Sequence, residues 1–284
     1  MEFKACDLGE FSSRKGLETI EDELRYRAKK GDSYNIYLIV LPNALKTSYK
    51  KIKKICLVDL KLVSQIVTQF TLGRKEFNSI ATKVLLQMAA KVGNTLWVPK
   101  PMESLRGVRI MLVGVDSTAD KNSKGKIIGF CASLNESHTK YFSSTIVQDS
   151  SSTVLEKMKE LMCRSIKAYT DENKYPPNEI VVLRDGCSAG EIRSIRESEV
   201  ENSLEALKLI DSHISLTYIV IDKKVSQKFF GQYNGNACNP QAGTLVNTDL
   251  VSENYDFYLV SQFSMRGTTV PTYYKVIYSD SKLE

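Results

Sequence analysis

The apolar positions of the first hundred residues follow a helical period in some stretches and a strand period in others, which predicts an α/β layout. A helix is expected over residues 17–30, where acidic residues come early and basic residues late. YNIYLIVLP predicts a buried strand, KTSYKKIKKICL a short basic helix and SQIVTQFTL a second strand. FNSIATKVLLQMAAKVG predicts the longest helix of this region. Its apolar face holds Ile80, Val84, Leu85 and Met88.

A change of pattern at VPKPMESLRG, with two prolines, predicts a domain boundary within residues 98–106 and hence domains over 1–100 and 105–284. RIMLVGVD, KIIGFCASL and TKYFSSTIVQD predict three strands, the last two forming a hairpin around NESH. A helix, the strand NEIVVLRDG, a long helix and the strand LTYIVIDKK follow. Ser188 and Glu191 form a capping-box pattern at the start of the long helix. YDFYLVSQ and YYKVIYSD predict short strands near the end.

The composition and the cysteine spacing indicate the cellular compartment of the protein. No apolar run approaches the ~20 residues that span a bilayer, and the first residues lack the pattern of a secretory signal. The six cysteines are far apart and form no C-x-x-C pair, which argues against a zinc site and for reduced thiols inside the cell. We therefore expect an intracellular protein, cytoplasmic or nuclear or both, with no membrane partner.

Positive charge is concentrated in the first third of the chain. Residues 1–100 hold 18 Lys/Arg and 10 Asp/Glu, whereas residues 101–284 hold 21 and 23. A basic module joined to a near-neutral one indicates an anionic partner for the first module, although a solvated basic surface would give the same balance.

Two carboxylates follow apolar strand patterns, Asp116 in IMLVGVD and Asp185 in VVLRDG. If the two strands are neighbours, both side chains lie at one edge of the sheet and offer the oxygen ligands that Mg²⁺ prefers. The alternative is that both are turn residues. Asp120 and Asp149 lie in polar stretches, and we expect His138 at a hairpin tip and His213 in a loop, both in solvent.

Several blocks occur in the order and spacing of the Piwi domain of Argonaute proteins: LVGVDSTAD, IIGFCASLN, STIVQD, VVLRDGCSAGEI, YIVIDKKVSQKFF and YDFYLVSQFSMRGTTVPTYYKVIYSD. The preceding segment, TSYKKIKK to NSIATKVLLQMAAKVG, resembles the MID domain of the same family. The resemblance runs from about Tyr34 to the end and is closer to the Piwi branch than to the Ago branch. It implies an α/β chain in which a Rossmann-like MID domain (1–100) precedes an RNase H-like Piwi domain (105–284) that is truncated at its C-terminus.

The resemblance also implies a function. Such proteins hold a small guide RNA by its 5′ phosphate, pair it with a target RNA, act with other silencing-complex proteins and cut the target with Mg²⁺ or Mn²⁺. The family's 5′-phosphate pocket falls on Tyr49, Lys53, Gln65, Gln87 and Lys91. Tyr49 would stack on the first base, the lysines would supply charge, and the glutamines would bind the phosphate or a cation. Guide-backbone contacts fall on Lys223, Lys224 and Lys228, which could also be ordinary surface lysines.

The family's catalytic, metal-binding aspartates fall on Asp116 and Asp185, but the rest of its site is altered. Thr153 stands where a glutamate is expected, and Glu156 lies three residues later. The final ligand is expected beyond the last residue, so the chain resembles a fragment that also lacks the N-terminal and PAZ domains. We therefore expect inefficient RNA cleavage. Three functions stay open: a guide-binding protein whose intact form cuts RNA, a silent guide-binding protein that recruits partners, and a generic RNase H-like nuclease.

Overall fold

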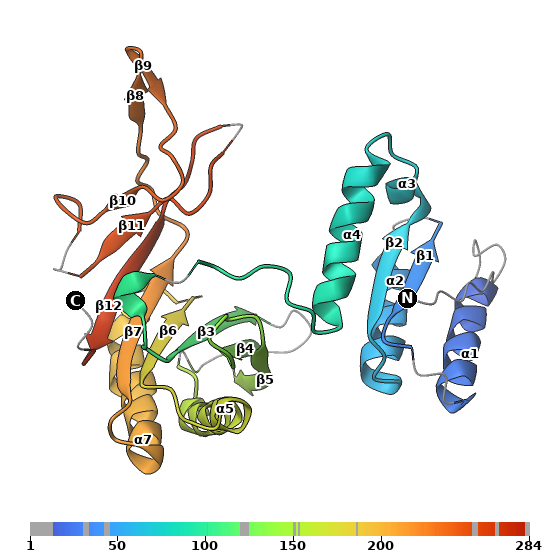
Figure 1. Cartoon of the computed structure of the whole chain (residues 1–284), viewed down its shortest axis with the longest axis horizontal. Helices are drawn as coiled ribbons and strands as arrows, with labels where there is room; N and C mark the ends of the chain where they lie inside the picture. Colours follow the sequence, from blue (N-terminus) through green and yellow to red (C-terminus); the bar gives the residue numbers. More distant parts are fainter. Residues whose placement is uncertain are drawn as a thin grey trace. The chain divides into compact units, whose positions relative to one another are not determined.

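The computed structural model describes residues 14–30, 34–42, 46–100, 102–119, 125–149, 152, 154–185, 187–251, 255–264 and 267–281. The chain forms two compact units, Met1–Val98 and Pro99–Glu284 (Figure 1). Each unit has its own hydrophobic core.

The first unit alternates helices and strands in the predicted order. Its elements are α1 (Arg14–Lys30), β1 (Tyr37–Leu41), α2 (Lys46–Lys54), the π-helical turn η1 (Ile55–Asp59), β2 (Ser64–Thr68), α3 (Gln69–Leu72) and α4 (Phe77–Lys91). β1 and β2 pair in parallel, with Tyr37 opposite Ser64 and Leu41 opposite Thr68. Parallel strands need a crossover connection, and here α2 and η1 provide it.

The core of the first unit lies between α1, α2 and the sheet. It includes Ile20 and Leu24 of α1, Leu41 of β1 and Ile52 of α2, all almost fully buried. The apolar face predicted for α4 is only partly covered: Met88 is buried, whereas Leu85 is 56% exposed. A sheet of two strands covers only one narrow side of a helix, so the full apolar stripe of α4 is not covered within this unit.

The second unit is built around one mixed sheet. Its strands are β3 (Ile110–Ala119), β4 (Gly125–Ser133), β5 (Tyr141–Asp149), β6 (Glu179–Arg184), β7 (Ser215–Asp222), β8 (Gly231–Tyr233), β9 (Asn236–Cys238), β10 (Leu245–Val246), β11 (Phe257–Leu259) and β12 (Thr272–Ser279). The sheet order is β10-β11-β12-β7-β6-β3-β4-β5, and the β8–β9 hairpin projects away from it (Figure 1).

Three strands at the centre of this sheet, β3, β6 and β7, are parallel neighbours. β4 and β5 add to β3 as the antiparallel hairpin that the sequence predicts. The remaining elements are the helical segments η2 (Glu103–Leu105), α5 (Met158–Asn173), η3 (Ala189–Glu191), α6 (Ile192–Ile195), η4 (Arg196–Val200) and α7 (Glu201–Ile210).

The long helix predicted after Ser188 is continuous but not uniformly α-helical. The five residues of η4 form a π-helical turn, and both Glu199 and Val200 in this turn are buried. One half of the predicted capping box forms, because the Ser188 N–H donates to Glu191 Oε2 at 2.6 Å. The other half does not: the Ser188 hydroxyl donates to the same Oε2 at 2.7 Å, and the Glu191 N–H donates to the Ser188 backbone carbonyl. α5 packs beside α7, and both contribute to one core with the inward side of the sheet.

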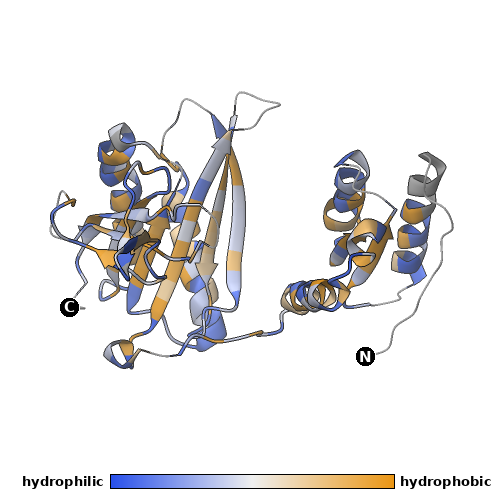
Figure 2. Cartoon of the chain, turned by 90° about the horizontal axis from the view of Figure 1, so that it is seen from above, coloured by the Kyte–Doolittle hydropathy of each residue, from blue (hydrophilic) through white to orange (hydrophobic). Residues whose placement is uncertain are grey.

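The hydropathy of the residues explains where this core forms. Apolar residues concentrate along the central strands of the large sheet (Figure 2). The buried apolar side chains of this core include Phe130 of β4, Ile166 of α5 and Val182 of β6. In the part of the chain that the structure describes, no helix is both long and apolar enough to cross a bilayer.

Candidate functional site

The two predicted metal-binding aspartates lie at one edge of the large sheet. β3 and β6 are parallel neighbours, with Val115 opposite Arg184, and the Asp185 N–H donates to the Val115 carbonyl at 2.8 Å. Asp116 does not end its strand as the pattern suggested, because β3 continues to Ala119 along β4. The β3–β6 pairing, however, stops at Val115, so both carboxylates follow the point where the two strands part.

An ammonium group is paired with one of these carboxylates. Lys223 Nζ forms an ion pair with Asp185 Oδ2. The hydrogen bond to Asp185, together with the negative charges of Asp185 and Asp116, raises the pKa of Lys223, despite an opposing contribution from burial. Lys223 was predicted to contact the guide backbone, and here it belongs to the carboxylate site as well.

The other two predicted backbone contacts lie in the exposed segment that follows β7. The Lys224 N–H donates to Asp222 Oδ1 at 2.7 Å, which turns the chain at the end of the strand. Lys228 is exposed six residues beyond the end of β7.

Asp116 and Asp185 could supply two of the ligands of a divalent ion. Two carboxylates with open positions suit a hard cation, and the remaining ligands would be waters or phosphate oxygens. Within the described ranges, no group of three His, Cys, Asp or Glu side chains is placed to hold a metal ion, so exposed Glu156 does not complete the site. Thr153 and Asp120 lie outside the described residues, and Asp149 is exposed at the end of β5.

Sequence reasoning missed the buried polar network directly behind Asp185. Arg184 is almost fully buried, and its Nε lies 3.0 Å from Oε2 of buried Glu199. Tyr218 donates its hydroxyl to the same carboxylate, and the Leu155 N–H donates to Glu199 Oε1 at 2.8 Å. Burial, then the negative charge of Glu199, raises the pKa of Tyr218 far above its usual value. The signal in the sequence was an arginine inside an otherwise apolar strand pattern.

The first unit contains a cavity of about 560 Å³ between α2, β2 and α4. Three of the predicted phosphate-pocket residues line it, Tyr49, Gln65 and Gln87. The other lining residues are Leu41, Lys46, Ile66, Val67, Thr68, Thr71, Ile80, Lys83 and Val84. The cavity therefore combines an apolar wall with basic and amide side chains, which is the mixture that a nucleotide needs.

Hydrogen bonds join four of the five predicted pocket residues. Gln65 donates to Gln87 Oε1 at 3.3 Å, and Lys91 Nζ donates to Gln65 Oε1 at 2.7 Å. Lys91 and Lys53 both donate to the Ser64 carbonyl, at 3.0 and 3.1 Å. The structure thus brings together residues that are up to 38 positions apart, from Lys53 on α2 to Lys91 at the end of α4.

Of the two ammonium groups at Ser64, that of Lys91 is affected by its surroundings. Burial, then the positive charge of Lys53, lowers the pKa of Lys91. Sequence reasoning did not single out Ser64, Lys46 or Lys83. Lys83 could have been found, because it lies one helical turn before Gln87 on α4 and therefore on the same face.

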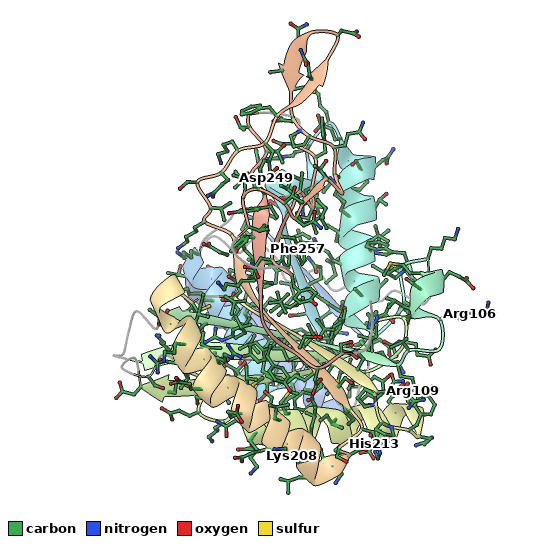
Figure 3. All side chains as sticks on the ribbon, turned by 90° about the vertical axis from the view of Figure 1, so that its left-hand side faces the viewer. Arg106, Arg109, Lys208, His213, Asp249 and Phe257 are labelled. Atoms are coloured by element: carbon green, nitrogen blue, oxygen red, sulfur yellow. The ribbon has the colours of Figure 1, made fainter. Side chains whose placement is uncertain are left out.

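Both histidines lie outside these two sites. His138 is at the β4–β5 turn as predicted, but it is half-buried and its Nδ1 lies 3.2 Å from Ser133 Oγ. Burial lowers the pKa of His138. His213 is 93% exposed and lies with Arg109 near the amino-terminal ends of the parallel strands (Figure 3), opposite the ends that carry Asp116 and Asp185.

The second unit is a mixed sheet with two carboxylates at one edge, and an α/β unit precedes it. Comparison with known proteins shows which family has this arrangement. The Piwi domain family matches residues 36–284. The chain therefore belongs to the Argonaute/Piwi family, and its second unit has the RNase H-like fold of a Piwi domain.

Individual relatives agree with the Piwi branch. Piwi-like protein 1 of Gallus gallus is 38% identical over 256 residues, covering 88% of this chain and 29% of that protein. The crystal structure of Drosophila Piwi has a TM-score of 0.78 and 28% identity, covering 94% of this chain and 36% of that one. The structure of Kluyveromyces polysporus Argonaute with a guide RNA shares the fold, with a TM-score of 0.79 at 19% identity over 92% of this chain and 34% of that one. The chain thus spans about 29% of the length of its curated relative.

Proposed function

We propose that the first unit of this chain, as a MID domain, binds the 5′-phosphorylated end of a small guide RNA for RNA silencing. The observation that carries the proposal is the convergence of Lys53 and Lys91 on one carbonyl oxygen beside the cavity. A phosphate oxygen is a stronger acceptor for an ammonium group than a neutral carbonyl oxygen, because the bond is then assisted by both charges. Binding a phosphate would also relieve the repulsion between the two lysines.

The cavity supports a nucleotide rather than a free phosphate. Tyr49 is half exposed at the cavity wall, where its ring is available to stack on a base. Gln65 and Gln87 are neutral and hold each other in place, so they can orient the phosphate or a bound cation without adding charge. The related Argonaute crystallised with a guide RNA is the precedent for this ligand, and the pocket residues extend it to this chain.

The second unit, as proposed, holds the guide backbone and target RNA but does not cut efficiently by itself. Asp116 and Asp185 can supply two ligands for Mg²⁺ or Mn²⁺, and a bound divalent ion would supply charge stabilisation and an activated water. Thr153, which stands where the family resemblance implies a glutamate, favours a guide-binding protein that acts through silencing-complex partners. The alternative is that further ligands, beyond those described, make the intact protein an RNA-guided nuclease.

The test is binding of a short 5′-phosphorylated RNA by single-site variants. Lys53→Ala and Lys91→Ala should each weaken binding about tenfold, since a hydrogen bond to a charged group contributes about 1.5–3 kcal/mol. Affinity for the same RNA with a 5′-hydroxyl end should hardly change. Lys54→Ala is the matched control, because Lys54 is the exposed neighbour of Lys53 on α2.

Two results would contradict the proposal. Equal losses in Lys53→Ala and Lys54→Ala would show a general basic surface in place of a phosphate pocket. In the same mixture with a matched target RNA and Mg²⁺, we expect little cutting. Efficient guide-dependent cutting that Asp185→Ala abolishes would replace the non-cutting account of the second unit with the nuclease alternative.

A further inference from the structure

The ion pair between Lys223 and Asp185 places a positive charge on one of the two carboxylates that could ligate a divalent ion. Lys223 follows β7, which pairs in parallel with β6 up to Val220 opposite Arg184. Its side chain is 63% exposed, whereas that of Asp185 is 21% exposed. The lysine therefore reaches from the solvent side onto a carboxylate that is fixed in the protein by its own backbone bond to β3.

The same ammonium group interacts electrostatically with both aspartates, Asp185 by direct contact and Asp116 through space. A carboxylate oxygen that accepts from an ammonium group has lost part of its capacity to ligate a cation. A divalent ion at this site would therefore have to displace Lys223 from Asp185, or bind next to a positive charge that repels it.

We propose that Lys223 is a built-in counter-ion of the Asp116–Asp185 pair, that it competes with divalent cations, and that an RNA phosphate group releases this competition by drawing Lys223 away. The flexible stem of lysine allows its ammonium group to exchange one anionic partner for another. The release of the competition rests on the proposed function, because it requires an RNA phosphate group as the anion that replaces Asp185 as the partner of Lys223. Lys223 would then couple occupancy by RNA to the metal affinity of the site.

Mn²⁺ binding to the chain without RNA tests the competition directly. We expect Lys223→Met to bind Mn²⁺ at the site about fivefold more tightly than the unchanged chain, as expected for removal of a partly screened ion pair. Lys224→Met is the matched control, because Lys224 is the exposed next residue and its substitution removes the same charge. Lys224 bonds to Asp222 Oδ1 through its backbone N–H, which the substitution retains. Asp185→Asn in each background identifies the binding that belongs to this site.

Each outcome of the Mn²⁺ titration either supports or overturns the competition between Lys223 and the divalent ion. If Lys223→Met increases the Mn²⁺ affinity more than Lys224→Met does, the result supports competition between Lys223 and the divalent ion. Equal gains, weaker binding by Lys223→Met, or no measurable Mn²⁺ binding that depends on Asp185 overturns it. Since Lys223 is mostly exposed, its substitution leaves the core intact, and the unfolding midpoint of each variant verifies this.

The release is tested by repeating the titration with a short 5′-phosphorylated RNA present. We expect the RNA to raise the Mn²⁺ affinity of the unchanged chain and to leave that of Lys223→Met unaltered. An equal rise in both would show that RNA acts on the metal independently of Lys223 and would overturn the coupling. RNA binding is measured separately in the same samples, so a failure of guide binding is distinguished from a failure of this inference.

Discussion

At the scale of single residues, the carboxyl group of Glu179 is the clearest case in which burial sets the charge state. Glu179 lies at the start of β6, is 4% exposed, and accepts hydrogen bonds from Thr217 Oγ1 at 3.3 Å and Ser281 Oγ at 3.0 Å. Burial, then the nearby charge of Asp280, raises its pKa, and the two hydroxyl groups offset this only in part. The folded protein therefore retains the proton of Glu179 to a higher pH than the unfolded chain does.

This raised pKa predicts how stability changes with pH. A group whose pKa is higher in the folded state stabilises the fold fully below its unfolded pKa and loses that contribution as pH rises through the folded pKa. Glu179→Gln keeps a neutral side chain that can hydrogen-bond both hydroxyls. We expect the difference in unfolding free energy, variant minus unchanged chain, to increase from pH 4.5 upward and then level off. Urea unfolding at several pH values measures it, and a difference that is constant with pH would contradict the prediction.

Single residues also show how far the sequence could predict the sites. The five pocket residues were expected only from the family resemblance, whereas the two aspartates also followed from the strand pattern. The structure brings the aspartates together because β3 and β6 are parallel neighbours that expose the same ends. The partner of Lys223 could not be predicted. The anion that this long, flexible side chain contacts depends on which residues lie near the end of β7 in the fold. Its partner Asp185 is 38 positions earlier in the sequence.

At the scale of elements, most helices and strands could be predicted, because the apolar period of each agrees with its burial in the fold. The π-helical turn η4 could not be predicted, because an extra residue in one helical turn does not change the apolar pattern recognisably. That turn contains Glu199, which joins β6, β7 and the segment before α5 through Arg184, Tyr218 and Leu155. One buried carboxylate thus fixes the strand that carries Asp185 against its helical layer.

Removing that carboxylate should be costly. Glu199→Ala leaves the buried guanidinium of Arg184 without its counter-charge, and we expect a loss of about 3–5 kcal/mol in unfolding free energy. The double variant Arg184→Met with Glu199→Leu should lose much less than the sum of the single variants, because neither charge is then buried alone. Denaturant unfolding measures all three.

An exposed pair in the same helical run provides the control. Glu197→Ala removes the partner of Arg193, which forms an i,i+4 pair on the surface, and should leave stability almost unchanged. A similar loss in Glu197→Ala and Glu199→Ala would show that the buried network has no special role.

At the scale of the whole molecule, the excess of positive charge lies in the first third of the chain, the part that is proposed to bind the 5′ phosphate of the guide. Residues 1–100 carry an excess of Lys/Arg over Asp/Glu, 18 against 10, and the structure places several of these lysines around the cavity of the first unit. The sequence alone left open whether this charge was a solvated surface. The fold favours a site, because Lys53 and Lys91 converge beside a cavity that Tyr49 and two glutamines complete.

The most direct test of this account compares one RNA with two different 5′ ends. The affinity of the unchanged chain is measured for 5′-phosphorylated and 5′-hydroxyl forms of the same short RNA at low and at physiological salt. We expect the phosphorylated form to bind at least about tenfold more tightly, corresponding to about 1.4 kcal/mol, and the ratio to persist when salt weakens both affinities. Equal affinities for the two ends at both salt concentrations would contradict the 5′-phosphate pocket.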